Sequence, residues 1–422
     1  MDASKIERQD KDLQIPDHVI LPFIEGDGIG KDITKKSLDV IDKAIESAYG
    51  KEKSIEWKEV LAGKKAKQKT GEYLPEKTIK TFREYKVGIK GPLRTPVGGG
   101  FRSLNVALRQ NLDLFVCLRP VEYIEGLPSP VKNPSAVDLH IFRENTEDIY
   151  AGVEYELGTD KNNQMNQFLL NEMGETSIRF PDSSGYGIKP VSKQGSQRLV
   201  EAAINYALDK DLPAVTLVHK GNIMKYTEGA FKNWGYEIAQ KKFGEQTFTQ
   251  LDYDRIKEKD GQRKADEKWS QAQKQGKVIV KDVIADAFFQ SLLLEPQNHS
   301  VIVTMNLNGD YISDMAAAMV GGIGISPGGN INYKNGRAIF EATHGTAPDI
   351  AGTGKANPSS FLLSAGLMLS YLGWEQAAQN LRNNVTQQII NKNVTEDLYH
   401  QIEGAVNCLS TEEFLEKLIG NF

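Results

Sequence analysis

The chain has 422 residues, which at about 150 residues per domain predicts two or three domains around a large core. Its 40% hydrophobic and 25% charged residues exclude a disordered or fibrous protein, and a net charge of −5 argues against a nucleic-acid partner, because no basic excess neutralises phosphates. Two distant cysteines, a charged N-terminus and the lack of a long apolar run predict a cytoplasmic protein with no signal peptide and no membrane partner.

Short apolar runs alternate with amphipathic segments along the chain. The first run, residues 19–24, ends at Gly26, Gly28 and Gly30, and helical periodicity follows over 32–47. Further strands are predicted at 87–89, 113–118, 137–142, 215–218 and 301–305, and a helix at 197–208. The alternation predicts an α/β chain built around a mostly parallel sheet.

Three segments interrupt or qualify this pattern. Residues 161–187 are largely polar and predict an excursion that could serve as an arm for a partner subunit, and residues 252–277 are densely charged and predict a solvated helix or peripheral insertion. The glycine turn departs from the spacing of the dinucleotide fingerprint. It therefore favours a turn that places Asp27 or Ile29 near a site over a Rossmann phosphate cradle.

Acidic residues could hold a divalent cation. Asp310 and Asp314 are four residues apart at the start of a predicted helix and share one face, where two close carboxylates favour a cation between them. Oxygen ligands without His or Cys favour Mg²⁺ or Mn²⁺. The alternative is that Asp310 caps the helix and Asp314 is solvated. A third carboxylate could be Asp282 or Asp286; both are expected on one helix face, and the pattern alone does not choose between them.

Arginines and short polar residues predict a site for a small polyanion. Arg109, Arg119 and Arg143 can each hold a carboxylate bidentately, and Ser103 and Asn105 are short hydrogen-bond donors. Arg143 directly follows a predicted strand, at the carboxyl end where α/β sheets bind ligands. Taken singly, each arginine could equally be a surface or salt-bridge residue.

Tyr150 and Lys220 complete the chemical set. Lys220 ends an apolar run, and a lysine beside a divalent cation can have its pKa lowered enough for proton transfer. His140 and His219 are predicted to be packed strand residues rather than ligands. The loop 341–352 is rich in small residues and could either cradle a nucleotide or be an ordinary surface loop.

Together these motifs resemble the β-decarboxylating dehydrogenases, that is, the isocitrate and isopropylmalate dehydrogenases, and within them the bacterial homodimeric isocitrate dehydrogenases. The resemblance is carried, in family order, by residues 23–30, 90–93, 98–110, 142–152, 215–224, 283–288, 305–314 and 344–358. It implies the α/β fold of that family rather than a Rossmann fold. The implied organisation is a large domain from 1–115 and 321–422, a small domain from 116–147 and 193–320, and a clasp at 148–192 that interlocks two subunits.

The resemblance implies metal-dependent oxidative decarboxylation of isocitrate to 2-oxoglutarate and CO₂, with hydride transfer to a nicotinamide cofactor. The residues that match the substrate contacts of the family are Ser103, Asn105, Arg109, Arg119 and Arg143. Asp286, Asp310 and Asp314 match the metal ligands, which selects Asp286 over Asp282. Lys220 matches the base and Tyr150 the acid, and Lys220 and Asp286 would come from the neighbouring subunit of a homodimer.

The resemblance also assigns the cofactor contacts. The matching positions are Lys90, Thr95, His344, Gly345, Thr346, Ala347, Asp349, Ile350 and Asn357. NADP-dependent relatives present Lys and Tyr after His-Gly-Thr-Ala-Pro, then Tyr and Arg near the C-terminus, where this chain has Asp349, Ile350, Glu396 and His400. Because Asp349 would bind ribose hydroxyls and repel a 2′-phosphate, we predict NAD as the cofactor. The alternative is that Asp349 only caps a helix and does not select the cofactor. Arg94 stands where the family has Thr or an acid.

Three other functions are weighed. An NADP-dependent isocitrate dehydrogenase would differ only in its cofactor. An isopropylmalate dehydrogenase is opposed by Ser103 and Asn105, because a polar pocket rejects an isopropyl group. A binding or regulatory subunit without activity is opposed by the intact catalytic and metal positions.

Overall fold

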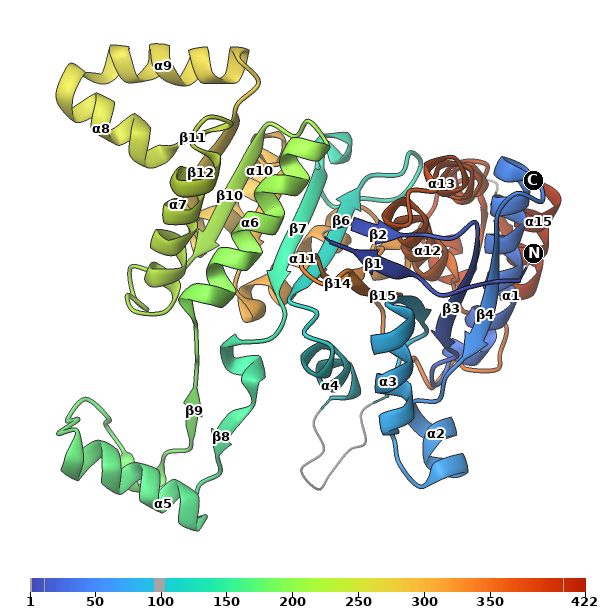
Figure 1. The fold of residues 1–422 in the computed structure, drawn as a ribbon, viewed down its shortest axis with the longest axis horizontal. Coiled ribbons are helices and arrows are strands. Elements are labelled where there is room, and N and C mark those ends of the chain that lie inside the picture. The colour runs from blue at the N-terminus through green and yellow to red at the C-terminus, as the bar shows by residue number, and fades with distance from the viewer. Residues whose placement is uncertain (1, 11, 95–102, 405) are drawn as a thin grey trace.

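A computed structural model describes residues 2–10, 12–94, 103–404 and 406–422 (Figure 1). Its central feature is a sheet of eleven strands in the order β11-β12-β10-β13-β7-β6-β14-β15-β5-β3-β4. The strands are β3 (His18–Ile24), β4 (Ser54–Glu59), β5 (Val87–Lys90), β6 (Val116–Glu122), β7 (Asp138–Glu144), β10 (Ala214–His219), β11 (Thr247–Thr249), β12 (Val278–Ile284), β13 (Val301–Thr304), β14 (Gly329–Asn332) and β15 (Arg337–Glu341).

The sheet consists of two parallel halves joined through antiparallel strands. β11, β12, β10, β13 and β7 pair in parallel, as do β15, β5, β3 and β4. Between them, β7, β6, β14 and β15 pair antiparallel. The predicted α/β class and mostly parallel sheet are confirmed. The antiparallel centre was not predicted, because hydrophobic periodicity reports burial and carries no information on strand direction.

Helices cover the sheet. They are α1 (Gly30–Tyr49), α2 (Gly63–Thr70), α3 (Glu76–Tyr85), α4 (Leu104–Asn111), α5 (Asp160–Gln167), α6 (Lys193–Asp209), α7 (Glu228–Phe243), α8 (Gln250–Asp260), α9 (Gln262–Lys274), α10 (Ala285–Leu294), α11 (Asn306–Met319), α12 (Ser359–Tyr371), α13 (Glu375–Ile390), α14 (Glu396–Tyr399) and α15 (Thr411–Gly420). α1 packs against α12, α13 and α15, so both ends of the chain lie at the β4 end of the sheet (Figure 1). The largest apolar cluster includes side chains from both halves of the sheet, such as Val19 and Val215.

Two short two-stranded ribbons lie outside the large sheet near the chain ends. β1 (Glu7–Gln9) pairs antiparallel with β2 (Asp12–Gln14), and β16 (Asn393–Val394) pairs parallel with β17 (Asn407–Cys408). No helix in the described part of the chain combines the length and the apolarity needed to cross a bilayer.

Two segments project from the layered body. In residues 153–188, called the arm below, β8 (Val153–Tyr155) pairs antiparallel with β9 (Tyr186–Ile188), and α5 lies at the far end (Figure 1). At the β11 edge, α8 and α9 form a helical hairpin held by edge-on contacts of Trp269 with Phe248 and Tyr253. This hairpin is the charged segment, and the prediction of a peripheral insertion is confirmed.

Candidate active site

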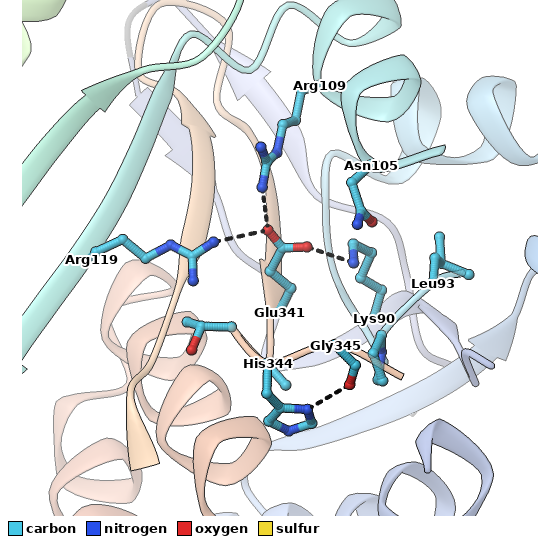
Figure 2. A pocket seen from close by; sticks show the side chains of 11 residues that line it. Lys90, Leu93, Asn105, Arg109, Arg119, Glu341, His344 and Gly345 are labelled. Carbon is cyan, nitrogen blue, oxygen red and sulfur yellow. Dashed lines mark hydrogen bonds and ion pairs between the residues drawn. The ribbon is translucent and has the colours of Figure 1, made fainter. Parts of the chain in front are cut away.

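Three cations surround Glu341 at the end of β15 (Figure 2). Glu341 Oε2 lies 2.5 Å from Lys90 Nζ of β5, and Glu341 Oε1 lies 2.9 Å from Arg109 Nη2 of α4 and 3.5 Å from Arg119 Nη2 of β6. Lys90 and Glu341 are directly paired positions of neighbouring parallel strands, so strand register alone brings the two charges together. Both side chains are buried, with at most 4% of their surface exposed.

The charges around Glu341 shift its proton affinity. Burial would raise the pKa of Glu341, but Lys90, Arg109 and Arg119 together hold the pKa well below its usual range. Burial lowers the pKa of Lys90, although the Glu341 carboxylate opposes this shift. Three cations thus face one carboxylate, and the excess positive charge suits an anionic ligand.

A cavity of about 140 Å³ lies beside this cluster and is lined by Asn105, Arg109, Arg119, His344 and other residues (Figure 2). Asn105 Oδ1 is buried and has no hydrogen-bond partner among the described side chains and backbone. A buried polar atom without a partner is costly, so Asn105 is poised to meet a ligand. Ser103 immediately precedes α4, at the same end of that helix.

A second cluster lies where β7 meets α11. Arg143 donates to Asn306 Oδ1 from Nε at 2.9 Å and from Nη2 at 2.7 Å, and its Nη1 lies 2.5 Å from Asp310 Oδ1. The Tyr150 hydroxyl donates to Asp310 Oδ2 at 2.9 Å, and the Arg143 guanidinium lies 5.0 Å from the centre of the Tyr150 ring. A Cβ atom at Gly309 would lie 2.4 Å from Arg143 Cγ, so only glycine leaves room for the arginine there.

The carboxylates of α11 influence the neighbouring groups. Partial burial and the Asp310 charge raise the pKa of Asp314, while Arg119 and Arg143 act in the opposite direction. Burial and Asp310 likewise raise the pKa of Tyr150, against the effect of Arg143. Arg119 and Arg143 therefore both act on Asp314, which connects the two clusters. α11 begins at Asn306, so Asp310 lies inside the helix and the alternative that it caps the helix is excluded.

Asp286 and Lys220 form a separate pair. Lys220 follows β10 directly, and its Nζ donates to Asp286 Oδ1 of α10 at 2.5 Å. The hydrogen bond from Lys220 lowers the pKa of Asp286. Among the described residues of one chain, no three His, Cys, Asp or Glu side chains are grouped to hold a metal ion. Within a single copy, Asp286 is thus not brought together with Asp310 and Asp314.

The expectation that Asp282 and Asp286 share a helix face is wrong. β12 ends at Ile284 and α10 begins at Ala285, so Asp282 lies on a strand and Asp286 on a helix. Asp282 is occupied by His219 Nε2 at 2.8 Å and by the Tyr236 hydroxyl at 2.5 Å. The apolar pattern around Asp282 fits either a strand or a helix, and pairing with β10 decides for the strand.

Both histidines named from the sequence are packed strand residues, as predicted. His219 is only 4% exposed, and His140 Nδ1 lies 3.0 Å from the Tyr206 hydroxyl.

The glycine turn contacts the loop 341–352. Ile29 N–H donates to the Thr346 carbonyl at 3.0 Å, and a Cβ at Gly28, whose φ is +55°, would lie 2.0 Å from that oxygen. The Asp27 carboxylate accepts from the backbone N–H groups of Lys64 at 2.8 Å and Arg94 at 3.0 Å. The turn therefore holds neighbouring loops in place.

The predicted cofactor residues are placed differently from one another. His344 lies at the cavity with its Nδ1 3.0 Å from the Gly345 carbonyl, and burial lowers its pKa. Its buried Nε2 has no hydrogen-bond partner among the residues that the structure describes. Gly345, Ala347, Asp349 and Ile350 are exposed along the loop, and Thr346 is half-buried. Asn357 is buried, donating to Asp397 at 3.0 Å and accepting from Ser359 N–H at 2.9 Å. Thr95 lies outside the described residues.

Glu341 and Asn306 are partners of the arginines that were not predicted from the sequence. Glu341 is a carboxylate that ends the apolar run Ala-Ile-Phe, and Asn306 lies four residues before Asp310, the first member of the predicted acidic pair. A charged residue at the end of a buried run is the signal that could have indicated Glu341. Its partners could not be named, since Arg109 and Glu341 are far apart along the chain.

Comparisons with known proteins give a consistent result. A family model described as isocitrate/isopropylmalate dehydrogenase matches residues 20–418. A protein of Staphylococcus epidermidis named isocitrate dehydrogenase [NADP] is 58% identical over 421 residues, covering 100% of both chains. One of Streptococcus mutans with the same name is 50% identical over 417 residues, covering 99% of both. A crystal structure of isocitrate dehydrogenase from Methylococcus capsulatus has a TM-score of 0.73 at 33% identity, covering 95% of this chain and 98% of that one.

These relatives contradict the prediction of NAD as cofactor, because they are named for NADP. The prediction relied on the negative charge of Asp349 and on the loss of the phosphate-binding cations, with His400 the only basic group left among the compared positions. In the structure Asp349 is exposed, where solvent and salt screen its charge. Lys355, which the prediction did not weigh, has its Nζ 2.9 Å from Glu396, and His400 Nε2 lies 3.9 Å from the same side chain.

Proposed function

Because the chain belongs to the isocitrate/isopropylmalate dehydrogenase family, we propose that it is an isocitrate dehydrogenase that uses NADP. The reaction would convert isocitrate to 2-oxoglutarate and CO₂. The full-length identity to enzymes of that name supports the proposal, and one structural observation carries it. Three cations face one carboxylate at Glu341, and Arg119 and Arg143 both act on Asp314 of α11, as a tricarboxylate bound together with a cation requires.

The arginines would bind the substrate. Arg109, Arg119 and Arg143 pair with carboxylates of the protein, and a bound tricarboxylate can take the place of some of these partners. Ser103 at the start of α4 and the side-chain amide N–H of Asn105 at the cavity would donate to the γ-carboxylate. This polar lining disfavours isopropylmalate, whose isopropyl group would leave buried polar atoms unpaired.

A divalent cation, Mg²⁺ or Mn²⁺, fits the oxygen donors present. Burial and the neighbouring Asp310 charge raise the pKa of Asp314, so a cation beside this carboxylate would be favourable. Asp286 of the partner subunit would complete the ligand set. When bound, such an ion polarises the C2 oxygen of the substrate and stabilises negative charge on it.

Two side chains would move protons. Lys220 would accept the proton of the C2 hydroxyl while hydride passes from C2 to the nicotinamide, and the β-carboxylate then leaves as CO₂ with its bonding electrons retained by the substrate. Tyr150 would protonate the carbon that results. A tyrosine hydroxyl is protonated at neutral pH, as a general acid requires, and its hydrogen bond to Asp310 orients it.

The cofactor would lie along the loop 341–352. The loop residues along that path are His344, Gly345, Thr346, Ala347, Asp349 and Ile350. Lys90 is buried at the same cavity. Thr95 and Asn357 would be further contacts. Lys355 and His400 are the basic groups that could pair with the 2′-phosphate of NADP.

We also propose a cytoplasmic homodimer with shared active sites. Ile223, Tyr226 and Leu294 are 70%, 90% and 79% exposed, and these apolar side chains follow Lys220 and Asp286 closely along the chain. Large exposed apolar residues in one region indicate an interface. In this proposal 148–192 is the clasp, 1–115 with 321–422 is the large domain, and 116–147 with 193–320 is the small one. Cys117 and Cys408 are both free, which fits a reducing compartment.

The test is a direct assay of the purified full chain. We expect reduction of NADP that requires isocitrate and also Mg²⁺ or Mn²⁺. One molecule of 2-oxoglutarate should form for each molecule of NADPH. Isopropylmalate in place of isocitrate, and chelation of the metal, are the controls. Faster turnover of isopropylmalate, or no turnover of isocitrate with metal present, would refute the proposal.

A further inference from the structure

The backbone around Lys220 is held by two buried side chains. Lys220 N–H donates to Glu228 Oε2 at 3.0 Å, and the next N–H, of Gly221, donates to His219 Nδ1 at 2.9 Å. Glu228 is 0% and His219 is 4% exposed. With Nδ1 as an acceptor, His219 donates from Nε2 to Asp282 at 2.8 Å. The peptide units that orient Lys220 are therefore fixed from both sides.

Glu228 also contacts two other parts of the fold. Its Oε1 lies 2.9 Å from Lys189 Nζ, and its Oε2 accepts from Asn308 Nδ2 at 2.8 Å. Lys189 directly follows the arm, and Asn308 lies in the first turn of α11, two residues before Asp310. One buried carboxylate thus joins the end of the arm, the end of β10 and the start of α11.

The other root of the arm enters the same network. Asp148 lies in the 3₁₀ turn Asp148–Ala151 that leads into the arm, is 0% exposed, and also pairs with Lys189. Its Oδ2 accepts from Leu307 N–H of α11 at 2.9 Å. Because buried carboxylates are stable only while they are paired, Lys189 must stay in place for Glu228 and Asp148 to keep theirs.

We propose that Glu228 is a positioning residue that fixes the Lys220 backbone and couples it to the root of the arm through Lys189. The assignment of proton transfer to Lys220 rests on the proposed function. A displacement of the arm would withdraw Lys189, leave Glu228 with an uncompensated charge, and loosen the N–H clamp on Lys220. The arm thereby acts on the chemistry of Lys220 without touching it.

Three variants and one control test this coupling. Glu228→Ala removes the clamp, Glu228→Gln keeps an oxygen for the Lys220 N–H but loses the charge that attracts Lys189, and Lys189→Met breaks the link to the arm. The control is Lys193→Met. It breaks an exposed ion pair of 2.8 Å between Lys193, at the start of α6, and Glu237, which lies in α7, the helix that also contains Glu228. The measurements are kcat, KM for isocitrate, and hydrogen exchange of the amides of residues 218–226.

Glu228→Ala should lower kcat about 100-fold and leave KM within about threefold, because the clamp orients a reacting group and the arginines are untouched. Glu228→Gln should lower kcat about tenfold or less. Lys189→Met should speed exchange of the Lys220 and Gly221 amides about tenfold or more, and Lys193→Met should change none of these quantities.

A native kcat in Glu228→Ala, an equal loss in Glu228→Gln, or native exchange in Lys189→Met would each overturn the coupling. If Glu228→Ala does not fold, the other two variants decide. The exchange measurement needs no turnover, so it tests the clamp even if the native chain proves inactive with isocitrate. That inactivity would refute the proposed function instead.

Discussion

The Glu341 carboxylate contacts Lys90, Arg109 and Arg119, so a change at this one side chain affects three cations at once. The three cations together stabilise the ionised form of Glu341. The buried Lys90, in turn, has no other carboxylate partner among the described residues. The residue is thus both a structural counter-charge and the group that keeps Arg109 and Arg119 aligned beside the cavity.

We predict that Glu341→Gln lowers the free energy of unfolding by about 3–5 kcal/mol, because it leaves Lys90 buried without a counter-charge. Chemical denaturation of the variant and the native chain checks this value. The folded-state pKa of Glu341 lies below its unfolded value, so its stabilisation is present above about pH 4.5 and is lost as pH falls through the folded pKa. The loss of stability on acidification should therefore be smaller in Glu341→Gln, and an unchanged pH profile would contradict the argument.

Lys355 gives a second prediction at this scale. If its ammonium group pairs with the 2′-phosphate, Lys355→Ala should raise KM for NADP about tenfold, since a charge-assisted hydrogen bond is worth about 1.5–3 kcal/mol. The KM for isocitrate should not change. Lys334→Ala, at an exposed lysine in the turn between β14 and β15, is the control. An unchanged KM for NADP would remove Lys355 from the cofactor site.

At the scale of elements, α11 carries Asn306 and Asp310, which contact Arg143 of β7, and Asp314, whose pKa responds to Arg119 and Arg143. Its Gly309 lies under Arg143, where an added Cβ would be 2.4 Å from the arginine side chain. Glycine inside a helix is ordinarily unfavourable by about 0.5–1 kcal/mol relative to alanine, so close approach is the physical reason for this one.

We predict that Gly309→Ala destabilises the protein by about 1–3 kcal/mol and raises KM for isocitrate at least tenfold, because Arg143 must move. Gly366→Ala in α12 is the matched control: its Cβ would meet nothing closer than 3.8 Å, so it should stabilise by a few tenths of a kcal/mol up to about 1 kcal/mol. Thermal unfolding and steady-state kinetics of both variants measure the contrast. Equal effects at the two glycines would contradict the role of Gly309.

At the scale of the whole molecule, the feature to explain is that Asp286 is not grouped with Asp310 and Asp314 among the described residues of one chain. Sharing between two copies would bring these groups into one site, and the exposed Ile223 and Tyr226 would then be covered. The proposed reaction would then depend on the association of two chains, and so would the affinity of the site for the metal ion.

We predict that inactive Lys220→Met and inactive Tyr150→Phe chains regain activity when they are mixed under exchange conditions. Each heterodimer would contain one site with both native residues, which at random pairing amounts to about a quarter of native activity. The same chains mixed without subunit exchange are the control. Confirmed exchange with no recovered activity would show that the sites are not shared.

Features that depend on neighbouring residues along the chain were predictable from sequence. The strands around residues 87, 140, 216 and 302, the peripheral nature of 252–277, and the pairing of Asp310 with Asp314 on one helix face all follow from periodicity and spacing, which are local properties. The arginines were identified by type. Their partners were not, and the cofactor was predicted wrongly from residues matched one at a time.

What tertiary structure alone decided were contacts between segments distant in sequence. Four features depend on which backbones pair. They are the strand direction in the centre of the sheet, the register that places Lys90 opposite Glu341, the location of Asp282 on a strand, and the burial of Glu228 between three elements. Periodicity determines which face of a segment is buried, but many arrangements bury the same faces. Choosing among them depends on packing and on the pairing of buried charges, which no short window of sequence contains.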